Sequence, residues 1–94
     1  MRYSELKYNG KVYTNELQIN EILEKENLFW LIDSEIEKAN IEIINNTLIW
    51  NEGNFYTGNW EYGIFKDGIF YGNWENGIWE NGNFAGKWKS GIKM

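Results

Sequence analysis

Aromatic residues and glycines recur at a short, regular spacing in the second half of the chain, and no other feature restricts the fold as strongly. From Trp50 onward an aromatic residue occurs every five positions, with two contractions to four, and a glycine follows each ring. Aligning the contractions gives a 14-residue unit that repeats nearly three times, from Tyr56, Phe70 and Phe84. Such repetition predicts that one small structural unit stacks on the next.

Each unit starts with the pattern aromatic-x-Gly-x-Trp. Side chains alternate across a β-strand, so the two rings and the glycine are expected on one face of one strand. A glycine between two rings is tolerated where a ring of the neighbouring strand covers it. The second glycine of each unit follows a polar pair and is expected to end a turn that needs positive φ; these are Gly63, Gly77 and Gly91.

Most rings of the repeat are expected to form the core, because a thin sheet has little else to bury. This scaffold set consists of Tyr56, Trp60, Phe70, Trp74, Phe84 and Trp88. Short connectors between the paired rings are expected to leave other aromatic side chains partly exposed. The resulting candidates for partner binding are Phe65, Tyr71 and Trp79.

The octet [Tyr/Phe]-x-Gly-x-Trp-x-x-Gly at 56–63, 70–77 and 84–91 resembles the core of the MORN (membrane occupation and recognition nexus) repeat. The resemblance covers residues 50–92 and implies β-hairpins stacked into an elongated sheet, with contacts to proteins and, in some members, to lipids. MORN units are longer than 14 residues and carry further glycines. The short unit therefore leaves two architectures open, the hairpin meander that we favour and a β-solenoid of short period.

The first half of the chain carries local signals of a different kind. Asn9-Gly10 between two alternating stretches predicts a β-hairpin. A capping box at Asn15 predicts a helix that runs to about Glu26. The apolar run at 28–32 has the length of a buried strand, and alternation on both sides of Asn45-Asn46 predicts a second hairpin.

Together these signals predict an α+β domain that is mostly antiparallel. Residues 1–49 are expected to form a capping segment of hairpin, helix and strands, and residues 50–94 the repeat sheet, within one compact domain. A repeat sheet needs a cap because its first unit otherwise exposes an edge and its rings. At the other edge, Lys87, Lys89 and Lys93 are expected to guard against pairing by their charge.

The composition excludes several kinds of chemistry. The chain has neither cysteine nor histidine, so disulfides, thiolate chemistry and histidine acid–base catalysis are excluded. Glu61 and Glu75 lie at equivalent positions of successive units, but the third unit has Lys89 there, which favours solvated turn charges over a catalytic carboxylate pair. No acidic cluster has calcium-loop spacing. We therefore expect no enzyme, no metal and no cofactor.

The formal net charge of −5 is concentrated in the first half. Residues 1–50 hold five basic and nine acidic side chains, giving −4, and residues 51–94 hold four and five, giving −1. An acidic chain is poorly suited to bind nucleic acid or anionic lipid, but it suits a basic protein surface such as a nucleic-acid-binding groove. The acidic candidates for such a contact are Glu21, Glu24, Asp33, Glu35 and Glu37.

No apolar run reaches the roughly 18 residues of a membrane span, and the first residues lack a signal-peptide core, so a cytoplasmic location is expected. The leading expectation is a non-catalytic protein-binding module: a small phage or bacterial adaptor or inhibitor, of anti-defence type, with an acidic surface. The first alternative is a carbohydrate- or cell-surface-binding module that uses exposed Phe65 and Trp79. The second is a structural repeat protein that assembles with further copies.

Overall fold

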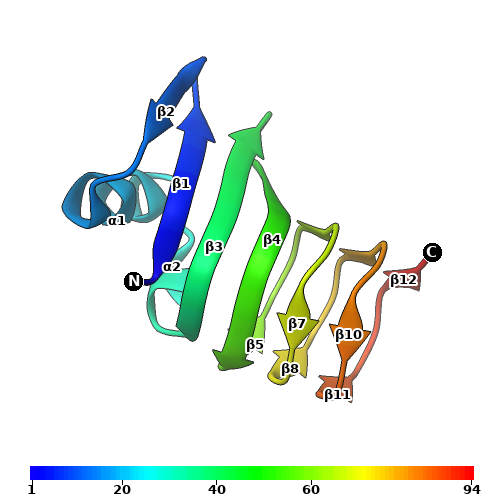
Figure 1. Cartoon of the computed structure of the whole chain (residues 1–94). Coiled ribbons are helices and arrows are strands. Elements are labelled where there is room, and N and C mark those ends of the chain that lie inside the picture. The colour runs from blue at the N-terminus through cyan, green and yellow to red at the C-terminus, as the bar shows by residue number, and fades with distance from the viewer.

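In the computed structural model of residues 1–94, long strands and two helices give way to a stack of short-stranded coils (Figure 1). Three long strands lie side by side, a short strand closes their outer edge, and the helices pack behind them. The long strands are β1 (Tyr3–Tyr8), β3 (Glu35–Ile44) and β4 (Thr47–Thr57). The edge strand is β2 (Lys11–Tyr13), and the helices are α1 (Glu16–Lys25) and α2 (Phe29–Ile32).

The local signals of the first half are confirmed at three places. Strands β1 and β2 form an antiparallel hairpin whose turn holds Asn9 at φ 51° and Gly10 at φ 76°. Helix α1 begins after Asn15, whose side-chain oxygen accepts a hydrogen bond from the backbone N–H of Gln18 at 3.1 Å. Strands β3 and β4 form the second hairpin and turn at Asn45-Asn46, both at positive φ.

The prediction of a strand at 28–32 is wrong, because this run forms the short helix α2 with Leu28 as its N-cap. The backbone N–H of Leu28 bonds to the carbonyl of Leu23 at 2.8 Å, so the run continues directly from the end of α1. Burial then follows a helical rather than a strand period: Leu31 is fully buried, whereas Phe29 is half exposed. A short apolar run has no periodicity of its own that separates these two outcomes.

The second half is a β-solenoid of about three turns, so the favoured hairpin meander is wrong and the alternative is confirmed. Strands β8 to β12 each pair in parallel with the strand one coil earlier, and in the first coil β6 and β7 pair in parallel with β4. The sheets are a mixed nine-stranded sheet and a parallel three-stranded one. The short strands are β5 (Asn59–Trp60), β6 (Ile64–Phe65), β7 (Ile69–Phe70), β8 (Asn73–Trp74), β9 (Ile78–Trp79), β10 (Asn83–Phe84), β11 (Lys87–Trp88) and β12 (Ile92–Lys93).

Glycines at the corners of the coil explain why the strands have only two residues. Gly77 lies at φ 122°, where L side chains are strained, and a Cβ there would lie 2.5 Å from the carbonyl oxygen of Gly63 in the coil below. The expected positive φ at Gly63, Gly77 and Gly91 is confirmed. The pattern aromatic-x-Gly-x-Trp, however, spans a corner between two strands instead of one strand face, because its first glycine also turns the chain.

Neither helix combines the length and the apolar composition that crossing a membrane requires. The core runs without a break from α1 and the long strands into the centre of the solenoid. One hydrophobic cluster therefore joins the cap and the repeat.

Candidate functional site

Nine rings of the repeat form three columns along the axis of the solenoid, and they fill its interior. Within each column the rings stack face to face, with centroids 4.4–5.6 Å apart, and rings of different columns meet edge to face. Both arrangements are favourable for aromatic quadrupoles. The columns are Trp50–Phe65–Trp79, Phe55–Phe70–Phe84 and Trp60–Trp74–Trp88.

The structure contradicts the exposure expected of Phe65 and Trp79. Phe65 is fully buried and Trp79 is 3% exposed. The connectors that carry them form strands β6 and β9, and the two rings stack on each other in the first column. Their rings are therefore not available to a partner or to a sugar. Trp60, Phe70 and Trp74 are fully buried as well, in the centre of the solenoid.

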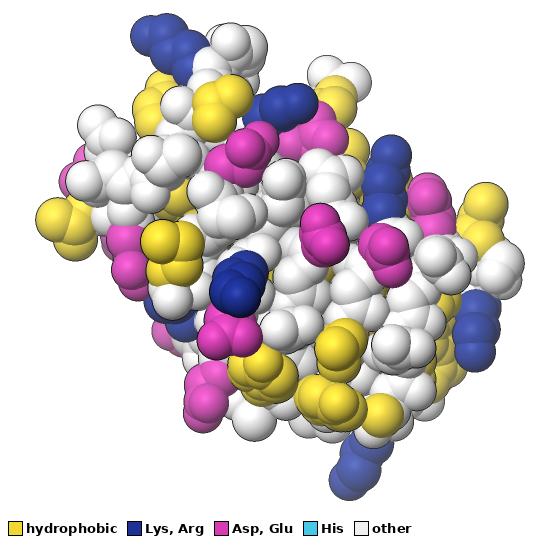
Figure 2. All heavy atoms as spheres, viewed as in Figure 1, with side chains coloured by type: hydrophobic (Ala, Val, Ile, Leu, Met, Phe, Trp, Pro, Cys, Tyr) yellow, Lys and Arg dark blue, Asp and Glu magenta, His cyan; other side chains and the backbone are white.

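Tyr56 lies outside the core, contrary to its place in the scaffold set. The neighbouring Phe55 pairs with Phe70 in register, so the first coil is one residue longer than the 14-residue unit. Tyr56 and Tyr71 instead stand on the outer surface, 38% and 52% exposed, with their rings stacked at 6.3 Å. Figure 2 shows hydrophobic side chains in a row along the lower edge of this face, where β4 and β7 end.

A small polar network borders the exposed tyrosines. The Tyr56 hydroxyl donates to a carboxylate oxygen of Glu37 at 3.0 Å, and the Asn54 side-chain amide donates to the same oxygen at 3.3 Å. These two hydrogen bonds lower the pKa of the Glu37 carboxyl, and the bond to the carboxylate raises the pKa of Tyr56. The Glu37 carboxylate is therefore hydrogen-bonded within the molecule and is less available to a basic partner.

The acidic candidates do not converge on one patch. Glu21 borders a hollow with Lys25 between α1 and the first hairpin, and Asp33 borders another with Glu61. Glu35 and Glu37 share a third hollow with Glu16, around Arg2 and the amino terminus. Glu24 lines none of these three hollows. The acidity of the cap is therefore spread over several sides of the molecule and is partly neutralised by adjacent cations.

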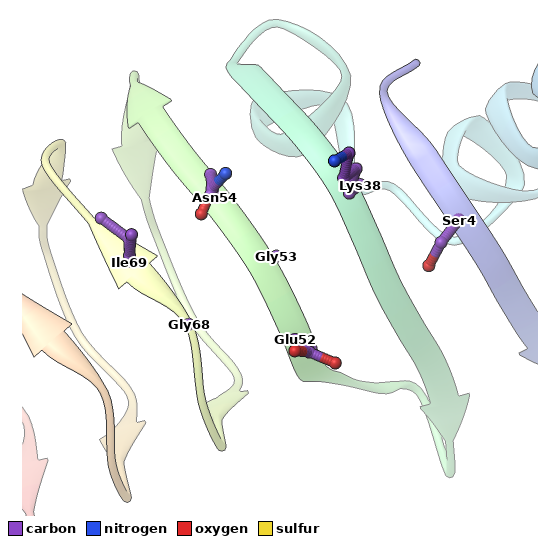
Figure 3. Close-up of a pocket in the computed structure, with 7 residues that line it drawn as sticks. All are labelled: Ser4, Lys38, Glu52, Gly53, Asn54, Gly68 and Ile69. Atoms are coloured by element: carbon purple, nitrogen blue, oxygen red, sulfur yellow. The ribbon is translucent and has the colours of Figure 1, made fainter.

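A shallow hollow of about 430 Å³ lies on the face of the long strands (Figure 3). Its polar side chains are Ser4, Lys38, Glu52 and Asn54, and Ile69 is the one hydrophobic residue that lines it. In Figure 3 these side chains are spaced over β1, β3, β4 and β7 and do not point to a common centre. The hollow follows from Gly53 and Gly68, which have no side chains to fill it.

Within residues 1–94, the coil of residues 80–94 has a neighbouring coil on one side only. In the coil before it, the carbonyls of Gly68, Gly72 and Gly77 accept hydrogen bonds from the next coil at 2.9–3.0 Å. One coil later, the equivalent carbonyls of Gly82, Gly86 and Gly91 have no protein donor within residues 1–94. The open face therefore presents the same row of acceptors that binds each coil to its successor, and we call it the open end.

Apolar side chains and lysines surround these free acceptors. Trp88 ends the third column and is 37% exposed, although it belongs to the scaffold set, because no ring covers its outer face. Ile92 and Met94 are 60% and 76% exposed. Lys87, Lys89 and Lys93 are exposed around them, and Lys89 forms an ion pair with Glu75 at 3.4 Å. The expected guarding lysines thus lie at the open end.

The sequence repeat identified the rings of the open end but not its backbone acceptors. The direction of strand pairing decides where carbonyls point, and ring spacing carries no signal of it. Comparisons with protein-family models, with curated proteins and with solved structures give no match. The resemblance to the MORN repeat therefore stays a prediction that rests on the octets alone.

Proposed function

We propose that this chain is a non-catalytic protein-binding module and that the open end is its contact surface. The observation that supports this most directly is the row of free glycine carbonyls on the last coil. A strand edge with unpaired backbone groups is a template for pairing with another polypeptide. Addition of a strand to such an edge is a recurrent mode of peptide recognition, in which main-chain hydrogen bonds supply affinity.

The side chains around the edge define the partner further. Trp88 and Ile92 offer apolar area beside the acceptors, and an aromatic side chain with one polar group suits an interface that is half wet. The residues after Glu80 hold three lysines and no acidic side chain. A partner surface with apolar and acidic side chains complements this surface. The acidic cap is the second proposed contact, for a basic partner in an adaptor or inhibitor role.

Site-specific photo-crosslinking tests the proposal in cells that express the chain. The variant Ile92→p-benzoylphenylalanine places the crosslinker at the open end, Glu24→p-benzoylphenylalanine places it on α1, and Lys66→p-benzoylphenylalanine is a matched control on the side of the coil. All three parent side chains are exposed, so the fold tolerates the changes. We expect polypeptide adducts at position 92 that are absent at position 66. Equal adducts at 92 and 66, or none at 92, would contradict the open end as the contact surface.

A second candidate function is carbohydrate binding at the Tyr56–Tyr71 pair. These rings are exposed, stacked, and flanked by the Asn54 amide and the Glu37 carboxylate, a combination of apolar faces and polar groups that suits a sugar. Titration with oligosaccharides, followed by NMR shifts of residues 54–56 and 71, tests it. Saturable shifts that Tyr71→Ala abolishes support this candidate, and flat titrations dismiss it.

A further inference from the structure

Strands β2 and β12 end the main path of the nine-stranded sheet within residues 1–94, and they run in the same direction. Strand β2 is antiparallel to β1, β1 is parallel to β3, and β3 is antiparallel to β4. The remaining steps, from β4 through β6 and β9 to β12, are all parallel. Two reversals cancel, so β2 and β12 point the same way at opposite ends of the sheet (Figure 1).

A copy of the chain shifted along the sheet axis therefore brings its β2 beside β12 as a parallel strand. This is the pairing that β12 already makes with β9 on its other side. A strand edge accepts such a neighbour because its unpaired N–H and C=O groups point outward. The sheet then continues from one copy into the next.

Exposed apolar side chains lie at both of these ends. The opposite end of the sheet, formed by β2 and α1, is called the capped end. There Val12 on β2 and Leu17 on α1 are 57% and 73% exposed. Trp88, Ile92 and Met94 are exposed at the open end. Contact between the two ends removes apolar area of both from water, which is the main favourable term in association.

The charges of the two ends are opposite. Residues 9–27 at the capped end hold Lys11 and Lys25 against four glutamates, a net charge of −2. Residues 80–94 at the open end hold three lysines against Glu80, a net charge of +2. Contact between unlike ends is attractive, whereas two open ends or two capped ends repel one another.

We propose that a second copy of this chain is the partner of the open end, docked head to tail with its β2 on β12. This inference rests on the proposed function and names the partner. After two copies dock head to tail, one open end and one capped end remain unoccupied. Further copies can therefore add, and an open array forms instead of a closed dimer. It also explains why the open end combines unpaired acceptors, apolar side chains and lysines.

The size of the ends sets the strength of the contact. The sheet axis has six strand spacings of about 4.8 Å, roughly 29 Å, which matches the longest extent of the molecule, 31 Å. The faces at its ends then measure at most 26 by 20 Å. The total buried surface is therefore no more than roughly 1,000 Å², the size of a weak and reversible interface. Association is expected only at high protein concentration.

Sedimentation of the wild-type chain over a range of concentrations is the first test. We expect the weight-average mass to rise above twice the 11.2 kDa monomer with no plateau, and added salt to reduce it. Two blocked variants then assign the contact. Trp88→Glu/Ile92→Glu disables the open end, and Val12→Glu/Leu17→Glu disables the capped end. Near-UV circular dichroism confirms that each blocked variant is folded, and Lys87→Glu/Lys93→Glu is the open-end alternative if the first does not fold.

Each blocked variant alone is expected to be a monomer, and an equimolar mixture is expected to stop at a heterodimer, because it has one intact pair of unlike ends. Dimers of the capped-end variant alone would show contact between two open ends and overturn the proposal. A wild-type chain that stays monomeric at all concentrations would overturn it too. If the wild-type chain is a monomer, crosslinks from position 92 to a different protein would still support the proposed function. The absence of any crosslink at position 92 would contradict both the proposed function and the head-to-tail contact.

Discussion

The cap and the solenoid bury apolar side chains in different ways. In the cap, elements of different kinds pack against one another. Helix α1 buries Ile19 and Leu23 in one hydrophobic cluster with residues of the long strands. In the solenoid each ring stacks on a ring at the same place in the next coil. Turns differ as well, since the cap uses asparagines at positive φ and the solenoid uses glycine corners with a neighbour below.

These two ways of packing explain why the two ends of the molecule are unlike. Packing between unlike elements has no unit to repeat, and the cap ends at β2 and α1. Packing by repetition has no internal stop, so the last coil presents the surface that would receive a further coil. Stability in such arrays is close to a sum over units and their nearest neighbours. Within residues 1–94, the last coil is therefore the least supported one, because it has a neighbouring coil on one side only.

Removal of a central ring is expected to cause the largest loss of stability. Trp74 is fully buried, with Trp60 and Trp88 stacked at 5.2 Å on its two sides. We expect Trp74→Ala to cost about 3–5 kcal/mol of unfolding free energy, because it empties the middle of a column. Urea unfolding measures the loss, with Tyr71→Ala as an exposed control. A cost similar to that of the control would show that the columns do not support the coils.

Substitution of a corner glycine tests the repeat through its backbone. In Gly77→Ala the new methyl group meets the carbonyl of Gly63 at a positive φ. We expect a loss of about 2–4 kcal/mol, from strained backbone plus overpacking. Gly10→Ala in the cap is the matched control, since its φ is also positive but nothing lies within 4 Å of the added Cβ. Thermal unfolding that ranks the two variants equally would contradict the close stacking of the corners.

A change at the start of α1 tests how much one local hydrogen bond contributes to the stability of the cap. Asn15→Ala removes the acceptor of the Gln18 N–H, and loss of such an N-cap costs about 1 kcal/mol. Urea unfolding should show this smaller effect, with Gln18→Ala as a control, because that exposed side chain is lost while the backbone N–H of the cap bond remains. A loss as large as that of Trp74→Ala would mean that the cap, and not the ring columns, limits stability.

The smallest expected effect lies where the two parts meet on the surface. Tyr56→Phe removes the hydroxyl that lowers the pKa of the Glu37 carboxyl, so that pKa rises toward its usual value. A lowered folded-state pKa contributes stability above the unfolded pKa, and this contribution is lost as pH falls through the folded pKa. Wild type and variant should therefore differ at neutral pH and converge in acid. NMR titration of Glu37 checks the direction, and an unchanged pKa would rule out the hydrogen bond.

Local signals predicted the cap well, because each depends on neighbouring residues. The Asn-Gly turn, the Asn15 cap and the Asn45-Asn46 turn all need a particular residue at a particular backbone angle. The run at 28–32 was misread because its conformation depends on the end of α1 and on the burial of Leu31. That information is tertiary and does not lie in the run itself.

The repeat predicted the rings and corners but not the topology. Ring spacing says which residues share an environment, and parallel coils and antiparallel hairpins satisfy the same spacing. The misplacement of Tyr56 has a similar cause: Phe55 and Tyr56 are both aromatic, and only the register with Phe70 separates them. The carbonyls of the open end carry no sequence signal, because every residue has one.

Amide hydrogen exchange at two protein concentrations tests the open end as a docking edge most directly. Neighbouring backbone groups of a strand point to opposite sides, so the amides of Phe84, Trp88 and Lys93 face the open end, whereas those of Ala85, Lys89 and Met94 bond to the coil below. We predict that all three exchange rapidly at low concentration, and that the amide of Lys93, in the strand that receives β2, gains protection at high concentration. Protection in the dilute monomer, or exchange that stays fast when the protein is concentrated, would contradict the account.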